Sequence, residues 1–370
     1  MPATETVALR PAPAVRDPLA PLQDIRAITR RDLAPIVSEI DEGFYPEAVL
    51  RAYGAAGAYG LHLAAPGHTL GQTIEGMASI AETCLSTGFM NWCQNTLVWY
   101  ILNSDNTALK RKFLGPCSEG RRLGGTGLSN PMKALFDIEP FRLKGRKVEG
   151  GYSVKGLLPW VSNLGPDHLF GAVFEVEGGS SVICLIDCSE PAVALKACEP
   201  FLAMDGTGTY QVQVRDLFVP DDMILADPAL PYIRTIRAGF VLLQAGMAIG
   251  LVRDCIAMMR EVEPSLGHIN RYLDVQPGMI EDQLQAVEDE VFALAKTPYD
   301  PSEAFWKRVV AMRLTGGEAS VAAAHHAMLH CGARGYVKAH RCQRRLREAY
   351  FVAIVTPATK QLRKMLAGLN

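Results

Sequence analysis

Apolar residues recur at two different spacings along the chain, and the spacing changes twice. Over residues 21–120 they recur every three or four positions, as in TIEGMASIAETCL, which predicts helices. Over residues 121–230 they alternate, and FRLKGRKVEGGYSVKG places Gly150-Gly151 between two alternating runs, as in a β-hairpin. From residue 231 to 370 the helical spacing returns in long segments. Separate blocks of helix and strand predict an α+β fold and argue against a parallel βαβ sheet.

These changes of spacing divide the chain into four parts. We expect a flexible arm over residues 1–20, an N-terminal helical domain over 21–120, a middle antiparallel β domain over 121–230 and a C-terminal helical domain over 231–370. A chain of 370 residues exceeds the length at which single hydrophobic cores stop growing, which agrees with more than one domain.

Composition argues against several kinds of partner. A net charge of −2 gives no electrostatic reason to expect nucleic acid, and no apolar run approaches the ~20 residues that span a membrane. Nine irregularly spaced cysteines favour reduced thiols and a cytoplasmic protein over a disulfide framework. His326 and His330 lie one helical turn apart, but no other ligand spacing accompanies them, so we predict packing histidines and no metal site.

Several stretches, in the same order along the chain, resemble motifs of the acyl-CoA dehydrogenase superfamily of flavoproteins. They read CLSTGFMNWCQNTL from residue 84, LGGTGLSNP from 123, KGLLPWVSN from 155, TGTYQVQVRDLFVP from 207 and GARGYVKAHRCQRRLREA from 332. Each motif is short, and their common order carries the resemblance. It implies a helical domain, a β domain and a C-terminal four-helix bundle around a flavin, assembled as a homodimer or homotetramer that acts on a small-molecule substrate.

The resemblance also implies roles for individual residues. Trp160 would stack near the flavin ring, and Ser162, on the same strand face, would reach its N5 atom. A buried strand tryptophan is the alternative for Trp160, and hydrogen bonds between helices are the alternative for Asn91 and Asn95. The implied positions are Leu128 and Ser129 at the pyrimidine edge, Gly332 and Ala333 at the adenylate end, Asn91, Asn95 and Tyr350 in the substrate pocket, and Ser162 and Thr356 as catalytic residues.

Two departures from the family pattern bear on the chemistry. The glutamate that would abstract an α-proton falls on Thr356, and the place near Gly239 and Phe240, where some members carry it, has no carboxylate either. A threonine hydroxyl cannot act as this base without activation. At the adenylate end, Leu329 and Gly332-Ala333 replace the family's glutamine and glycine pair. The cofactor is therefore expected to be FAD or FMN, and a separate flavin reductase could supply it in reduced form.

Three hypotheses of function follow. The first is a flavin-dependent monooxygenase that uses reduced flavin and O2, through a C4a-hydroperoxyflavin, on a small organic substrate. The aligned position of the histidine that such enzymes often place near the flavin holds Val355, which weakens this hypothesis. The alternative is a divergent acyl-CoA or acyl-carrier dehydrogenase whose base has moved, for instance to Glu348. The third is a catalytically decayed paralogue that serves as a scaffold.

Overall fold

The computed structural model describes residues 20–63 and 68–369. The expected arm therefore lies outside the described residues, apart from Ala20. The helices that precede the sheet are α1 (Ala20–Ile28), α2 (Val37–Asp41), α3 (Glu47–Ala55), α4 (Leu70–Ala81), α5 (Leu85–Asn103) and α6 (Thr107–Ser118). Side chains define several helix starts: Thr69 and Gln72 form a capping box on α4, and Asn106 accepts from the Leu109 N–H at the start of α6.

The middle of the chain forms a mixed sheet around one short helix. Its strands are β1 (Gly124–Thr126), β2 (Leu143–Val148), β3 (Gly151–Val161), β4 (Leu169–Val176), β5 (Ser181–Asp187), β6 (Val193–Ala197), β7 (Tyr210–Pro220) and β8 (Ile224–Ala226), with α7 (Ser129–Ala134) between β1 and β2. The strand order is β6-β7-β3-β2-β4-β5-β8, and β1 pairs with β4. The predicted β2–β3 hairpin is confirmed, with Gly150 at a φ of 74° in the turn.

The sequence predicted a purely antiparallel sheet, but the sheet is mixed. The β1–β4 and β2–β4 pairings are parallel, whereas β3 pairs antiparallel with both β2 and β7. Alternation reports which strand face is buried and contains no information on strand direction, so the two parallel pairings could not be predicted from it.

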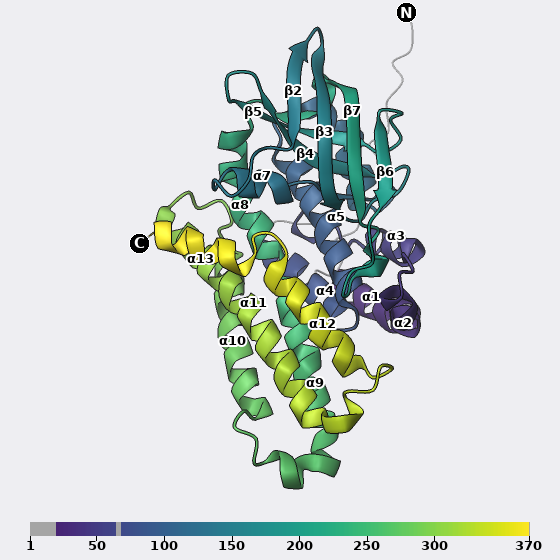
Figure 1. The fold of residues 1–370 in the computed structure, drawn as a ribbon, viewed down its shortest axis with the longest axis vertical. Helices are drawn as coiled ribbons and strands as arrows, with labels where there is room; N and C mark the ends of the chain where they lie inside the picture. Colours follow the sequence, from purple (N-terminus) through teal and green to yellow (C-terminus); the bar gives the residue numbers. More distant parts are fainter. Residues whose placement is uncertain (1–19, 64–67, 370) are drawn as a thin grey trace, which may run out of the picture.

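The C-terminal part is helical, as predicted. It comprises α8 (Ala229–Leu243), α9 (Ala245–Asn270), α10 (Pro277–Leu294), α11 (Glu303–Cys331), α12 (Arg341–Ile354) and α13 (Thr359–Gly368). Figure 1 shows α9, α10, α11 and α12 running side by side as a four-helix bundle, with α13 lying across its upper end. The three-part α+β architecture expected from the sequence is thereby confirmed.

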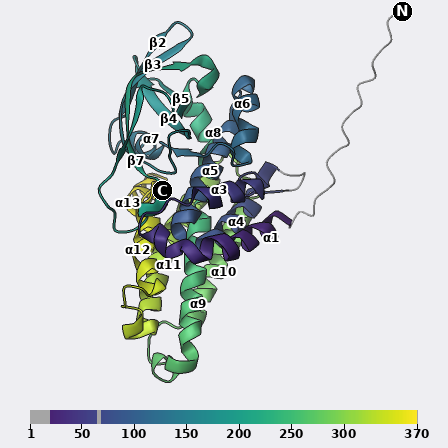
Figure 2. The same cartoon turned by 90° about the vertical axis from the view of Figure 1, so that its right-hand side faces the viewer.

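Helix α5 is the central element between the sheet and the bundle. Every residue from Leu85 to Ile101 is buried, because the helix contacts α4, α6, α8 and β1 on different sides (Figure 2). The segment Ala229–Asn270 is long and apolar enough to cross a membrane, but 89% of its most apolar window is buried inside the protein. The core helix of a folded domain has the same length and apolar composition, and this segment packs against α4, α5 and α11.

Candidate functional site

A small hollow opens where the end of β3 meets the start of α7. Its lining comes from Gly127, Ser129, Asn130, Lys133, Glu139, Leu158, Pro159 and Trp160. Trp160 is 57% exposed, so the alternative of a buried strand tryptophan is wrong. An exposed aromatic face beside hydroxyl and amide groups suits a flat ligand that has an apolar surface and a polar edge.

The connection between α12 and α13 brings Thr356 to this hollow. The hydroxyls of Thr356 and Ser129 lie 2.8 Å apart, although 227 positions separate the residues. Gln244 donates from Nε2 to the Thr356 carbonyl at 2.8 Å, and Arg313 donates from Nε to Gln244 Oε1 at 2.6 Å. Arg313 also donates to the Val352 carbonyl. Burial lowers the pKa of Arg313 to about 10, so its guanidinium is charged at neutral pH.

Ser162 lies just beyond the end of β3, on the same face as Trp160. Its hydroxyl oxygen is 2.7 Å from that of Thr209, which is 2.8 Å from that of Thr207. Strand β1 passes directly behind it, because a Cβ on Gly125 would lie 2.0 Å from the Ser162 carbonyl oxygen. Only glycine permits this close approach of the two backbones.

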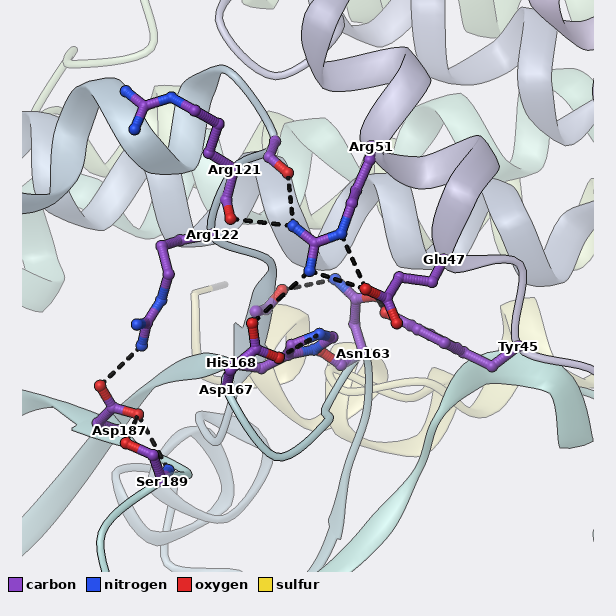
Figure 3. Close-up of polar contacts among 12 residues, drawn as sticks. Tyr45, Glu47, Arg51, Arg121, Arg122, Asn163, Asp167, His168, Asp187 and Ser189 are labelled. Atoms are coloured by element: carbon purple, nitrogen blue, oxygen red, sulfur yellow. Dashed lines mark hydrogen bonds and ion pairs between the residues drawn. The ribbon is translucent and has the colours of Figure 1, made fainter.

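Asn163 fixes the chain immediately after Ser162 (Figure 3). It has a φ of 61°, a left-handed conformation that asparagine tolerates better than most residues. Its Nδ2 donates to the Gly124 carbonyl and its Oδ1 accepts from the Tyr45 hydroxyl, both at 2.7 Å. Its carbonyl accepts a 3.0 Å bond from Nδ1 of His168. Burial lowers the pKa of His168, which favours the neutral ring with its proton on Nδ1.

Arg51 of α3 extends these contacts to the protein surface (Figure 3). Its guanidinium donates to the carbonyls of Gly120 and Arg121, pairs with Glu47 at 2.8 Å and lies 3.7 Å from Asp167. Helix α3 is thus attached to the segments that precede β1 and β4. Together with Asn163, these contacts hold the position of Ser162 from three parts of the fold.

Comparisons with known proteins agree with this arrangement. Residues 19–121 match the family model described as acyl-CoA dehydrogenase, N-terminal domain. The human mitochondrial short-chain specific acyl-CoA dehydrogenase is 23% identical over 94% of this chain and 88% of its own length. An isovaleryl-CoA dehydrogenase of Oryza sativa is 24% identical over 94% and 89%. Residues 19–121 thus resemble the N-terminal domain of acyl-CoA dehydrogenases, and the chain is similar to such enzymes along 94% of its length. Among solved structures, butyryl-CoA dehydrogenase from Megasphaera elsdenii matches with a TM-score of 0.83 and 18% identity, over 95% of this chain and 97% of that chain.

The lining of the hollow is of the kind that can hold the ring half of a flavin. The exposed indole of Trp160 offers an apolar face and Ser129 offers a hydroxyl, which is bonded in turn to that of the buried Thr356, while Ser162 lies two residues beyond Trp160. Leu128 directs its side chain into the core, where it is 2% exposed, so only its backbone can meet a ligand. These residues can hold a flavin ring by stacking and by hydrogen bonds at its edge.

The two residues expected at the adenylate end lie far from the hollow. Gly332 and Ala333 lie at the far end of α12, and this helix of 14 residues is about 21 Å long. A residue pair at that distance from Thr356 does not adjoin the hollow. The predicted contact of Gly332 and Ala333 with a cofactor bound at Trp160 therefore requires either an extended ligand or a second copy of the chain.

The structure does not bring Asn91 and Asn95 to the hollow. Phe89 of α5 packs against Phe351 of α12, with ring centroids 4.6 Å apart. Asn91 is two residues further, and 100° per residue places it about 200° around the helix from Phe89. Asn95 donates from Nδ2 to Asn91 Oδ1 and to its carbonyl at 3.0 Å. Their place in the substrate pocket stays a prediction, because the bond between them lies within α5 and not between helices, and Nδ2 of Asn91 and Oδ1 of Asn95 are buried without a hydrogen-bond partner. Tyr350 is half exposed on α12, and its role stays a prediction.

Glu348 cannot serve as a relocated base in this conformation. Its carboxylate is 1% exposed and accepts a 2.8 Å bond from Nη1 of Arg345, which is itself fully buried. Arg345 also donates from Nε to Asp254 at 2.6 Å. Moving Glu348 would break this buried ion pair at a cost of about 3–5 kcal/mol. The suggestion that Glu348 moves into reach is not supported.

The other candidate places for a carboxylate are also restricted. A Cβ on Gly239 would lie 2.4 Å from the Trp99 ring, so no acidic side chain fits there without repacking. Glu139 lines the hollow but accepts a 2.9 Å bond from Asn130 and lies near Lys133 and Arg142. Desolvation raises its pKa, but these partners outweigh that effect and lower it overall. An ionised carboxylate with so many partners is a weak base.

Sequence reasoning missed the residues that hold the site in place. Thr207 and Thr209 occur in TGTYQVQVRDLFVP, one of the stretches that carry the resemblance, but no role followed from it for either hydroxyl. Gln244 and Arg313 occur within apolar helical segments, where their polarity was the only available signal. A buried polar residue on the core face of a helix signals an internal hydrogen-bond partner, but the partner's identity depends on the tertiary fold.

Proposed function

We propose that the chain is an FAD-dependent dehydrogenase of short acyl thioesters, carried by coenzyme A or by an acyl carrier. One observation carries the proposal: the exposed Trp160 face with Ser129, Ser162 and Thr356 around it, in a chain related along 94% of its length to proteins named as acyl-CoA dehydrogenases. Bound FAD would supply the hydride acceptor. The chain binds and orients the thioester and excludes water. Neither FMN nor a flavin reductase finds support among the relatives.

Buried aromatic rings support a short acyl chain. Phe89 and Trp92 of α5 stack with centroids 5.6 Å apart, and Trp92 meets Phe240 of α8 at 5.2 Å. Phe351 of α12 closes the cluster against Phe89. All but Phe351 are buried, and they fill the space between α5, α8 and α12. A long apolar chain could enter between these helices only if the rings moved.

The hydroxyl pair of Ser129 and Thr356 sets the expected rate. Removing an α-proton from a thioester needs a positioned base, and a neutral hydroxyl is a poor one. We therefore expect slow dehydrogenation, fastest for thioesters whose α-proton is already acidic. A carboxylate supplied at position 356 would be ionised, because the charged Arg313 lies one hydrogen-bonded residue away.

The experiment is an anaerobic titration of the FAD-loaded protein with acyl-CoAs of increasing chain length. We expect slow bleaching of the visible flavin band by short acyl-CoAs and less by long ones. Thr356→Glu should accelerate bleaching by roughly 10²-fold or more, the usual contribution of a positioned base, and Thr356→Gln is the matched control. If FAD binds but no acyl-CoA bleaches it in either the wild type or Thr356→Glu, the proposal is refuted.

A monooxygenase is the second candidate, on one observation. The position that would carry a base holds a neutral Ser129–Thr356 pair, with the cation of Arg313 one hydrogen-bonded residue away. Such a site suits a reaction that does not begin by removing a proton from carbon. The relatives named above favour the dehydrogenase. The two separate when the protein-bound flavin is reduced and then mixed with O2. Reoxidation much slower than that of free flavin, with little hydrogen peroxide, would favour the monooxygenase.

A surface groove supports the expected homodimer or homotetramer. It lies between α10 and α11, and its lining includes Ala286, Val287, Ala311, Met312, Ala319 and Ala322. We propose that a second copy of the chain covers it. Light scattering should then give a mass above that of one chain, reduced in Ala319→Glu; a monomeric wild type would contradict this. A cytoplasmic location likewise stays a prediction.

A further inference from the structure

Three hydroxyls form a continuous chain that leads from the end of β3, two residues beyond Trp160, into the β domain. Ser162 Oγ lies 2.7 Å from Thr209 Oγ1, and Thr209 Oγ1 lies 2.8 Å from Thr207 Oγ1. Thr207 Oγ1 lies 2.7 Å from the Met204 carbonyl oxygen. Thr207 is buried, whereas Thr209 and Ser162 are half-buried, so the chain of hydroxyls ends inside the protein at Thr207 and is more exposed at Ser162.

The buried end fixes the direction of every proton in this chain. A carbonyl oxygen only accepts, so Thr207 must donate its single hydroxyl proton to Met204. Thr207 can then only accept from Thr209, and Thr209, its proton used, can only accept from Ser162. We infer that Ser162 presents an acceptor, and no proton, to whatever binds on its open side.

This inference rests on the proposed flavin site and adds a selectivity to it. The N5 atom of an oxidised flavin is an acceptor, whereas the reduced ring carries N5–H and donates. If Ser162 meets the ring edge, as the resemblance implies, an acceptor-only hydroxyl would stabilise the reduced form and would leave two acceptors opposed in the oxidised form. The Ser162–Thr209–Thr207 chain is therefore a device that makes the site prefer reduced flavin.

Backbone hydrogen bonds hold the residues of this hydroxyl chain in place. The Asn163 N–H donates to the Thr207 carbonyl at 2.9 Å, which ties the backbone after Ser162 to the backbone at Thr207. The Met204 carbonyl also accepts the Thr207 N–H at 3.2 Å. Replacing the Thr207 hydroxyl thus leaves no carbonyl without a donor. Thr207 is a positioning residue, because it would act on the ligand only through Thr209 and Ser162.

The test uses Thr207→Val, with Thr207→Ser as the matched control. Valine has nearly the shape of threonine but cannot accept from Thr209, so Thr209 becomes free to donate to Ser162, and Ser162 to the ligand. The measurement is the ratio of the dissociation constants of oxidised and reduced FAD for the full-length protein, obtained from the reduction potentials of bound and free flavin. No substrate or turnover is required.

We expect the preference for reduced FAD to fall about tenfold in Thr207→Val, the worth of one hydrogen bond of about 1.4 kcal/mol, which is about 30 mV for two electrons. Thr207→Ser should keep the wild-type ratio, and Thr209→Val should behave like Thr207→Val. An unchanged ratio in both valine variants overturns the inference and leaves the flavin site standing. If the wild type binds neither form of FAD, both the inference and the proposed function fail.

Discussion

The side chain of Asn163 offers a direct measurement of how firmly the end of β3 is held. Asn163→Ala removes two hydrogen bonds, to the Gly124 carbonyl and from the Tyr45 hydroxyl, each 2.7 Å long. Each contributes about 1 kcal/mol net. Alanine at a φ of 61° adds about 1 kcal/mol of strain that asparagine largely escapes. The expected loss in the free energy of unfolding is therefore about 3 kcal/mol.

A double-mutant cycle with Tyr45 separates these contributions. Tyr45→Phe removes only the hydroxyl that donates to Asn163, so it should cost about 1 kcal/mol. Combined with Asn163→Ala, it should cost nothing further, because its partner is already gone; the coupling energy is then about 1 kcal/mol. The assay is urea unfolding followed by tryptophan fluorescence. Strict additivity, or a loss below 0.5 kcal/mol for Asn163→Ala (roughly the scatter expected of neutral surface changes), would refute the reasoning.

Three further changes probe other parts of the molecule. Trp92→Leu should extend bleaching of bound FAD to longer acyl-CoAs, because it removes a ring from the buried cluster; an unchanged chain-length profile would contradict this. Arg345→Met should lower the free energy of unfolding in urea by about 3–5 kcal/mol, since Asp254 and Glu348 lose their shortest cationic partner and keep only Arg341 and Arg344, at 3.6 and 3.8 Å. Burial lowers the pKa of His62 from 6.5 to about 4, so protons favour the unfolded chain and stability falls as the pH drops through that window. His62→Gln should reduce that loss between pH 7 and pH 4 by on the order of 2–3 kcal/mol, and an identical pH dependence in both proteins would exclude it.

The parts of the fold that could be predicted are those in which burial repeats with a regular period. The helical blocks and the β2–β3 hairpin depend on local spacing, and the structure has them where the sequence predicted them. Ser129 and Thr356 were both picked out by motif position, and they meet at 2.8 Å across 227 positions. The motif order carried that information, because it fixes which segments of a shared fold approach one another.

The predictions that failed all required knowledge of partners distant in the sequence. Glu348 is a possible base on the sequence alone, but in the fold it is buried against Arg345, and nothing in the local pattern distinguishes a free from a paired carboxylate. The place of Asn91 and Asn95 in the substrate pocket stays a prediction for the same reason, because periodicity does not say which neighbour their shared helix face meets. The role of Thr207 depends on a carbonyl at Met204, a backbone group that every residue type has.

A buried positive charge, that of Arg313, lies near Thr356, the position at which the family pattern has a glutamate. The Arg313 guanidinium donates to the Gln244 side chain and to the carbonyls of Val352 and Val355. Among the hydrogen bonds and ion pairs of residues 20–63 and 68–369, no carboxylate contacts it, so its charge is not neutralised locally. In a buried setting such a charge acts over several ångströms. The Ser129–Thr356 pair therefore lies in a positive potential, which favours a ligand that arrives with negative charge or develops it during the reaction.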